Sequence, residues 1–220
     1  GPEPESPGRH DADWHSIEEY LEHVAGRNVQ NVAAHVPYAN VRALARGFGP
    51  GRVDDYQMRE IRAGIRRGME AGAVGLSTGL DYVSQCYADT DELVAACAAL
   101  RERDGLYVTH VRYKLGLLPA LREAVEIGRR AGVRVHISHL KGQSPGEVEQ
   151  VLEFIDGTAR HEVEFSFDVY PYQPGSTMQV GEHPSIATML PSSQASTPIA
   201  TTPSPQDIVH MPVEHRPVAP

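Results

Sequence analysis

The stretch VTHVRYK (residues 108–114) is followed about one repeat later by HISHLKG (residues 136–142). Each begins with a short run typical of a strand and reaches a histidine, and a cation stands two positions beyond that histidine. Residues i and i+2 of a strand lie on the same face, so His110 shares a face with Arg112, and His139 with Lys141. The pattern therefore predicts two strands that each end in a histidine and a cation on one face.

Apolar, β-branched runs of this kind alternate with helical patterns along most of the chain. We expect strands at residues 29–36, 73–77, 106–110, 133–139 and 163–169. We expect helices at residues 14–25, 54–71, 90–103, 117–131 and 145–160, and Asp89 followed by Glu92 predicts a capping box before the third of them. This alternation indicates consecutive βα units of about 30 residues around a parallel sheet. The predicted fold class is α/β, a partial TIM-type (β/α) barrel of about five units.

The composition limits the classes of protein to consider. The net charge of −9 argues against nucleic-acid binding, and no apolar run reaches the roughly 20 residues that span a bilayer. Two cysteines, Cys86 and Cys97, are too few for a disulfide framework and favour a reducing compartment. We therefore predict a cytoplasmic protein with neither a nucleic-acid nor a membrane partner, and the oligomeric state stays open.

The two ends of the chain differ from its middle. Residues 1–13 are rich in Pro and Gly, lack the features of a signal peptide and are expected to be loose. From residue 185 to 220 the sequence is rich in Pro, Ser and Thr without a sustained period, which predicts a disordered tail. The predicted barrel domain is therefore residues 14–184.

The histidines that close two neighbouring predicted strands are candidate metal ligands. Functional groups of parallel α/β sheets gather at the carboxyl ends of the strands, and neighbouring strands lie about 4.8 Å apart. His110 and His139 can then reach one ion, and zinc accepts histidine nitrogen at about 2.0–2.1 Å. The alternative is a pair of hydrogen-bonded structural histidines.

Other polar residues near these strand ends are candidate substrate contacts. Arg112 and Lys141 could pair with the carboxylate of a small substrate, or they could form ordinary salt bridges at the strand ends. In FDVYPYQPG (residues 167–175), a tyrosine hydroxyl above the metal could donate a hydrogen bond to a developing oxyanion. The alternative for Tyr170 and Tyr172 is an aromatic cover over a loop.

Four blocks together resemble the D-aminoacylase (N-acyl-D-amino-acid deacylase) family of the amidohydrolase superfamily. They are EAGAVGLSTGLDYVSQCYADTDEL, YVTHVR, HISHLKG and FDVYPYQPGST, in the family's order, and the resemblance runs from about residue 14 to 184. It implies a metal-dependent (β/α)8 barrel that hydrolyses the amide of N-acyl-D-amino acids to a D-amino acid and a carboxylate. It also implies zinc ligands His110 and His139, substrate-carboxylate contacts Tyr82 and Lys141, and Tyr172 as the group that polarises the scissile carbonyl.

The resemblance covers only part of the family's barrel. The family's first His-x-His strand, its Asn-Cys-Gly segment and its aspartate on the eighth strand are not visible here, so we expect an internal part matching strands three to seven. Two histidines lack the third protein ligand of a catalytic zinc site, so we expect the 220 residues alone to be inactive. Two alternatives stay open: an amidohydrolase acting on cyclic amides or ureides, and a non-catalytic protein, either a degenerate fragment or a chain that binds a partner over the open sheet.

Overall fold

A computed structural model describes residues 14–170 of the chain and shows a single parallel sheet. The sheet order β1-β2-β3-β4-β5 is also the chain order. The strands are β1 (His35–Pro37), β2 (Gly75–Gly79), β3 (Leu106–His110), β4 (Arg134–Ile137) and β5 (Phe165–Phe167). Every neighbouring pair of strands is parallel, and this confirms the prediction of consecutive βα units.

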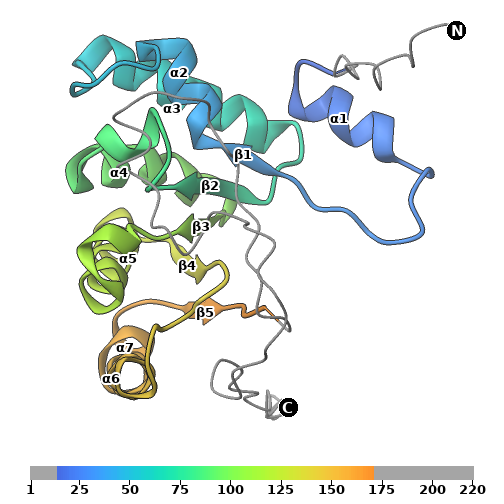
Figure 1. Cartoon of the computed structure of the whole chain (residues 1–220). Helices are drawn as coiled ribbons and strands as arrows, with labels where there is room; N and C mark the ends of the chain where they lie inside the picture. Colours follow the sequence, from blue (N-terminus) through green and yellow to red (C-terminus); the bar gives the residue numbers. More distant parts are fainter. Residues whose placement is uncertain (1–13, 171–220) are drawn as a thin grey trace, which may run out of the picture.

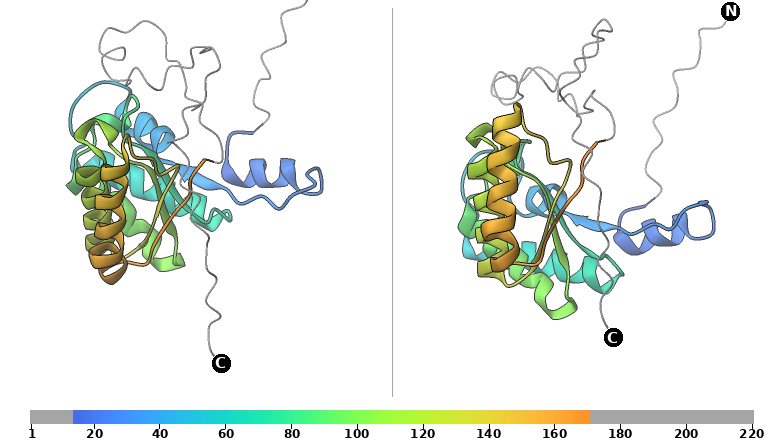
Figure 2. Two further views of the ribbon diagram at one scale, coloured as in Figure 1. Left: turned by 60° about the horizontal axis from the view of Figure 1, so that its bottom comes forward. Right: turned by 90° about the horizontal axis from the view of Figure 1, so that it is seen from below.

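Helices connect the strands and pack on one side of the sheet (Figures 1 and 2). The α-helices are α1 (Ile17–Val24), α2 (Tyr38–Arg46), α3 (Asp55–Glu70), α4 (Thr90–Cys97), α5 (Leu117–Ala131), α6 (Pro145–Phe154) and α7 (Arg160–Glu162). A 3-10 turn (Ala98–Arg103) extends α4, and a π turn (Ile155–Ala159) joins α6 to α7. In the views of Figures 1 and 2, α1 stands apart from the other helices, beyond β1.

The core lies between the sheet and these helices. One row of strand residues crosses the sheet in register, with Val36 beside Leu76, Leu76 beside Tyr107, and Tyr107 beside Val135. All four are buried, and they belong to one cluster with the apolar faces of α3, α4 and α5. Gly75 permits the close approach of β3, because a Cβ atom there would lie 2.0 Å from the carbonyl oxygen of Leu106.

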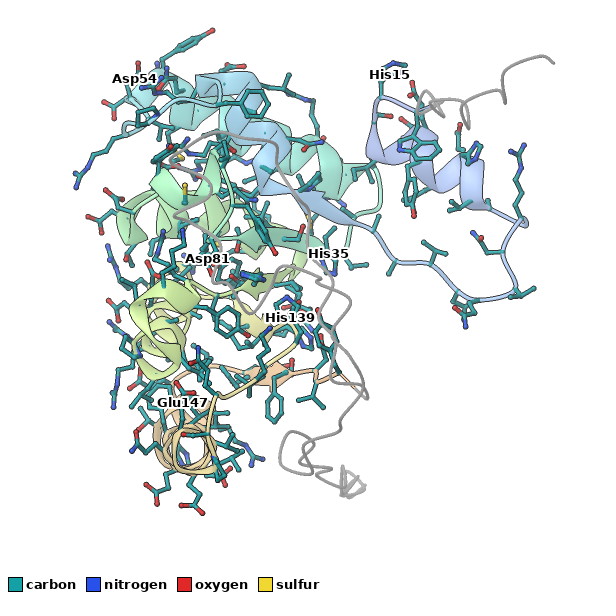
Figure 3. The ribbon with its side chains drawn as sticks, in the orientation of Figure 1. His15, His35, Asp54, Asp81, His139 and Glu147 are labelled. Carbon is teal, nitrogen blue, oxygen red and sulfur yellow. The ribbon has the colours of Figure 1, made fainter. Side chains whose placement is uncertain are left out.

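The opposite face of the sheet is more polar. The neighbouring row places Ser77 beside Val108, Val108 beside His136, and His136 beside Ser166. Successive strand residues alternate between the two faces, so these side chains point away from the helix-covered core. Figure 3 shows His35 and His139 on this side of the sheet. The fold therefore positions histidines on a face that no helix of residues 14–170 covers.

Three of the predicted strands are shorter in the structure, and the second, predicted over residues 73–77, is displaced to Gly75–Gly79. The first was predicted over residues 29–36, but it covers only His35–Pro37, and the side chain of Val29 is fully exposed. The fourth was predicted over residues 133–139 but covers Arg134–Ile137, so His139 and Lys141 lie beyond the strand and do not share a strand face as predicted. The last was predicted over residues 163–169 and covers Phe165–Phe167. A β-branched run becomes a strand only where a neighbour offers hydrogen bonds, and β2 and β4 pair with β1 and β5 over three residues each.

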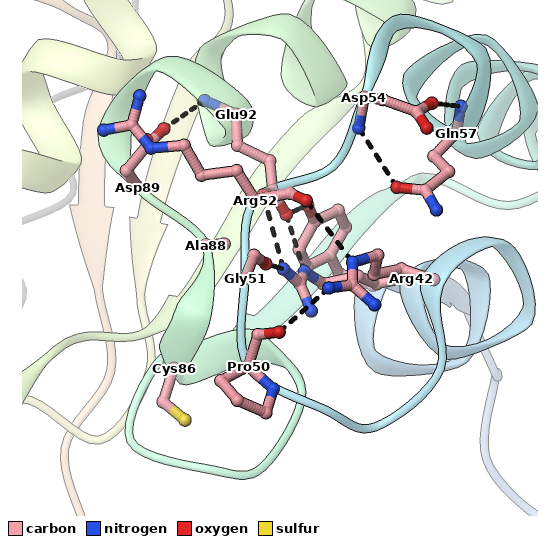
Figure 4. Close-up of polar contacts among 12 residues, drawn as sticks. Arg42, Pro50, Gly51, Arg52, Asp54, Gln57, Cys86, Ala88, Asp89 and Glu92 are labelled. Carbon is pink, nitrogen blue, oxygen red and sulfur yellow. Dashed lines mark hydrogen bonds and ion pairs between the residues drawn. The ribbon is translucent and has the colours of Figure 1, made fainter.

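Helix α2 was not predicted, and its anchoring changes the role of Glu92. The side chain of Asp89 caps α4 by accepting a hydrogen bond from the Glu92 amide, as expected. The Glu92 carboxylate, however, does not complete the capping box but accepts hydrogen bonds from Arg42 Nε at 2.6 Å and from the Tyr38 hydroxyl at 2.5 Å (Figure 4). Arg42 also donates to the carbonyl oxygen of Gly51 at 2.9 Å, so this buried network ties α2 to α4 and to the loop before α3.

Several predictions concern parts of the chain outside the described residues. The loose segment 1–13, the tail 185–220 and Tyr172 all lie there, as does the end of the predicted domain after residue 170. Within residues 14–170, none of the helices has the length and the apolar character needed to cross a membrane.

Candidate metal centre

The structure brings His110 and His139 together at the carboxyl ends of β3 and β4. Nδ1 of His110 lies 3.0 Å from Nε2 of His139, and the ring centroids are 4.7 Å apart. His110 is the last residue of β3, and His139 follows the end of β4 by two residues. The predicted proximity of the two imidazoles is therefore present in the fold.

The backbone around His139 is held in an uncommon conformation. His139 has a φ of 44°, in the left-handed region that few non-glycine residues adopt. Its amide donates a hydrogen bond to Oδ1 of Asp168 at 2.7 Å, and the amide of Leu140 donates to the carbonyl oxygen of Asp168 at 2.7 Å. Asp168 Oδ2 also lies 2.9 Å from Nε2 of His136. Asp168, just after β5, thus fixes the turn that presents His139.

Two residues beside the histidines were not predicted from the sequence. Asp81, two positions after β2, is 2% exposed, and its Oδ2 lies 3.2 Å from Nε2 of His110. The amide of Tyr113 donates to the same oxygen at 3.1 Å, and the Tyr113 hydroxyl donates to the carbonyl oxygen of His139 at 3.0 Å. The position of Asp81 just beyond a strand end, like that of the two histidines, was the signal in the sequence that could have identified it.

The geometry and charge of the two imidazoles suit a shared zinc ion. Two nitrogens at about 2.0–2.1 Å from a tetrahedral zinc are about 3.3 Å apart, close to the observed separation of 3.0 Å. Burial lowers the pKa of His139, and the neighbouring His110 lowers it further. The lowered pKa favours the neutral imidazole that a metal requires. Residues 14–170 contain no group of three or more His, Cys, Asp or Glu side chains that could hold a metal. This part of the chain therefore offers two ligands.

The predicted substrate contacts lie at different places around the histidines. The Tyr82 ring packs against His110, with centroids 4.9 Å apart, and the Lys141 ammonium lies 6.0 Å from the centroid of the Tyr113 ring. Burial lowers the pKa of Lys141. The ring of Tyr170 lies 5.5 Å from that of His139. Tyr82 thus contacts His110 directly, whereas Lys141 lies over Tyr113, whose ring packs against both histidines.

The side chain of Arg112 is largely buried and bonds to groups inside the protein. Its Nε lies 3.1 Å from Glu123 Oε2, and its two terminal nitrogens donate to the carbonyl oxygens of Cys86 at 3.0 Å and Ala88 at 2.8 Å. These contacts correspond to the salt-bridge alternative that the sequence left open. They hold the segment after β2 against the middle of α5, and the substrate role of Arg112 stays a prediction.

Comparison with known proteins identifies relatives of one kind. A curated D-aminoacylase from Alcaligenes xylosoxydans xylosoxydans is 35% identical over 153 residues, which are 67% of this chain and 31% of the relative. The chain is a homologue of the D-aminoacylases. It spans about a third of the length of the curated relatives that it matches. No model of a protein family matches the chain.

Solved structures of D-aminoacylase family members share the fold. N-acyl-D-glutamate deacylase from Bordetella bronchiseptica, solved with zinc and a phosphonate that mimics the tetrahedral intermediate, superposes with a TM-score of 0.67 at 33% identity, over 73% of this chain and 35% of that one. A D-aminoacylase whose structure defines a subset of amidohydrolases superposes with a TM-score of 0.65 at 29% identity, over 72% of this chain and 34% of that one. The sheet and helices of this D-aminoacylase homologue are thus part of an amidohydrolase fold of the TIM-barrel type.

Proposed function

We propose that this chain supplies part of the zinc-dependent active site of an amidohydrolase that releases D-amino acids from N-acyl-D-amino acids. The observation that carries the proposal is the separation of 3.0 Å between Nδ1 of His110 and Nε2 of His139. It occurs at the carboxyl ends of adjacent strands, where enzymes with this fold place their catalytic groups. A zinc-containing N-acyl-D-glutamate deacylase among the structural relatives supports the choice of metal and substrate class.

The roles of the residues follow from their positions. Nδ1 of His110 and Nε2 of His139 would hold the zinc ion, and zinc, when bound, lowers the pKa of a coordinated water to about 7. Tyr82 packs beside His110 and Lys141 lies over Tyr113, and on the family resemblance we assign both to the carboxylate of the N-acyl amino acid. Tyr172 is assigned to the scissile carbonyl by the family resemblance alone, since it lies outside the described residues.

A hybrid enzyme tests the activity. Residues 14–170 of this chain replace the matching segment of the Bordetella N-acyl-D-glutamate deacylase, and the hybrid is tested on N-acyl-D-amino acids, their L-enantiomers and cyclic ureides. We expect zinc-dependent release of D-amino acids only, and its loss in the His110→Ala and His139→Ala hybrids. A folded, zinc-loaded hybrid that hydrolyses cyclic substrates and no N-acyl-D-amino acid would replace this proposal with the alternative amidohydrolase class.

The 220-residue chain itself is expected to bind zinc without turnover. Residues 14–170 provide two candidate ligands, whereas catalytic zinc sites usually have three protein ligands. Metal analysis of the purified chain is the measurement, with His110→Ala and His139→Ala beside it. Unchanged zinc content in both variants would remove the metal assignment and favour a non-catalytic role.

The remaining expectations on location and partners belong to the same proposal. We infer a cytoplasmic location, because both Cys86 and Cys97 are thiols and a reducing compartment keeps them so. The proposed partner is a small N-acyl amino acid and neither a nucleic acid nor a membrane, in accord with the net charge of −9.

A further inference from the structure

Asp81 is a buried carboxylate whose position needs an explanation. Its side chain is 1% exposed, and its Oδ2 receives the Tyr113 amide at 3.1 Å and lies 3.2 Å from Nε2 of His110. Its Oδ1 is also buried and has no hydrogen-bond partner among the described residues. Burying a carboxylate with one oxygen unsatisfied is unfavourable, and stability alone does not account for it.

The contact with Asp81 decides which nitrogen of His110 is free to bind a metal. An ionised carboxylate only accepts hydrogen bonds, so Nε2 of His110 must carry the hydrogen that is shared with Asp81. In the neutral ring, Nδ1 then holds the lone pair, and Nδ1 is the atom that faces Nε2 of His139 at 3.0 Å. Without this contact, His110 would also populate the other tautomer, in which Nδ1 carries the hydrogen and cannot coordinate.

The geometry points to Asp81 as a positioning residue that selects the Nε2–H tautomer of His110 and thereby tightens zinc binding at its Nδ1. This inference rests on the proposed function, because it takes the histidine pair to be the metal site. Hydrogen bonds from a metal-bound histidine to a carboxylate typically change metal affinity 10- to 100-fold. Asp81 does not touch the proposed ion, and its action passes through the ring of His110.

A second contact keeps Asp81 in place and links the two ligands. Tyr113 donates its amide to Asp81 and its hydroxyl to the carbonyl oxygen of His139 at 3.0 Å. The Tyr113 ring also packs edge-on against His110, with centroids 5.1 Å apart. Asp81 therefore sets the orientation of His110, and Tyr113 holds Asp81 in place and supports the turn at His139.

The test compares zinc affinities of the full 220-residue chain at one fixed pH. Competition with a chromophoric chelator gives the zinc Kd of the wild type and of Asp81→Asn, and circular dichroism shows that each protein is folded. We expect Asp81→Asn to raise the Kd 10- to 100-fold. The matched control is Asp89→Asn, the same change at the cap of α4, where asparagine caps as well as aspartate and the Kd should stay within about twofold.

Two further measurements separate this inference from the proposed function, and the first of them needs no Asp81 variant. Long-range 1H–15N NMR of the zinc-loaded wild type should place the hydrogen of His110 on Nε2, and a hydrogen on Nδ1 overturns the inference. His110→Ala should abolish tight zinc binding. Loss in His110→Ala with an unchanged Kd in folded Asp81→Asn refutes only the role of Asp81, whereas unchanged binding in His110→Ala refutes the metal site itself.

Discussion

The hydroxyl of Tyr113 donates a hydrogen bond to the carbonyl oxygen of His139 across 3.0 Å. This contact clamps the left-handed backbone conformation of His139, the second candidate ligand. The two residues are 26 positions apart in the chain. The donor follows β3 and the acceptor follows β4, so the clamp joins two successive strand ends. The backbone conformation of His139 is thus set by a contact from the neighbouring βα unit.

Removing the Tyr113 hydroxyl should loosen the metal centre. We expect Tyr113→Phe to lower the free energy of unfolding by about 1 kcal/mol and to raise the zinc Kd several-fold, because the turn at His139 loses a hydrogen bond. Urea unfolding and chelator competition measure the two effects. Tyr107→Phe is the control: it removes a buried hydroxyl that accepts from Thr78 on the core side of the sheet, and should leave the zinc Kd unchanged. Equal Kd values in both variants would contradict the clamp.

Substitution of Arg112 distinguishes its two possible roles. Lysine cannot reproduce the fork that reaches Glu123 and two carbonyl oxygens, so Arg112→Lys should lower the free energy of unfolding by about 2 kcal/mol. In the hybrid enzyme, this variant should leave KM for the N-acyl-D-amino acid unchanged, whereas Lys141→Met should raise it. A higher KM with unchanged stability in Arg112→Lys would instead restore the substrate role predicted from the sequence.

The buried pair of Arg42 and Glu92 should dominate the attachment of α2. The side chains are 0% and 4% exposed, so Arg42→Met leaves a buried carboxylate without its cation and should cost about 3–5 kcal/mol. Arg129→Met, which removes the half-exposed pair with Glu126, should change stability by less than about 1 kcal/mol. Urea denaturation measures both. A small effect of Arg42→Met would mean that α2 is held by apolar contacts instead.

Alkaline pH should weaken the fold through groups that burial keeps neutral. Burial raises the pKa of the Cys97 thiol. Burial is also the largest of the effects that raise the pKa of the Tyr107 hydroxyl. Unfolding frees both to ionise near their ordinary values of about 8.5 and 10, so their contribution to stability is complete below pH 8 and declines above pH 9. Urea midpoints from pH 7 to 10.5 measure the decline. Native Cys97 should also resist a thiol reagent at pH 8, and rapid labelling of folded protein at Cys97 would contradict its burial.

The order of the five strands and the positions of the two histidines followed from the sequence, because they depend on local patterns. Strand β3 has its predicted bounds, and α5 covers the predicted residues 117–131. A period of two residues in strands, a period of 3.6 in helices and a repeat of about 30 residues are properties of neighbouring positions. The convergence of His110 and His139 then required only that equivalent strand ends meet at one edge of a parallel sheet.

Other features were decided by contacts between distant parts of the chain. The ends of β1 and β5 depend on how far their neighbours extend. The Glu92 side chain does not form the expected capping box, because it bonds instead to Arg42, which is 50 residues away and buried beside it. Asp81 and Tyr113 entered the centre for the same reason, since their partners lie in other βα units. Local patterns place a side chain at a strand end, but the partner that satisfies a buried charge or amide exists only after the strands have assembled.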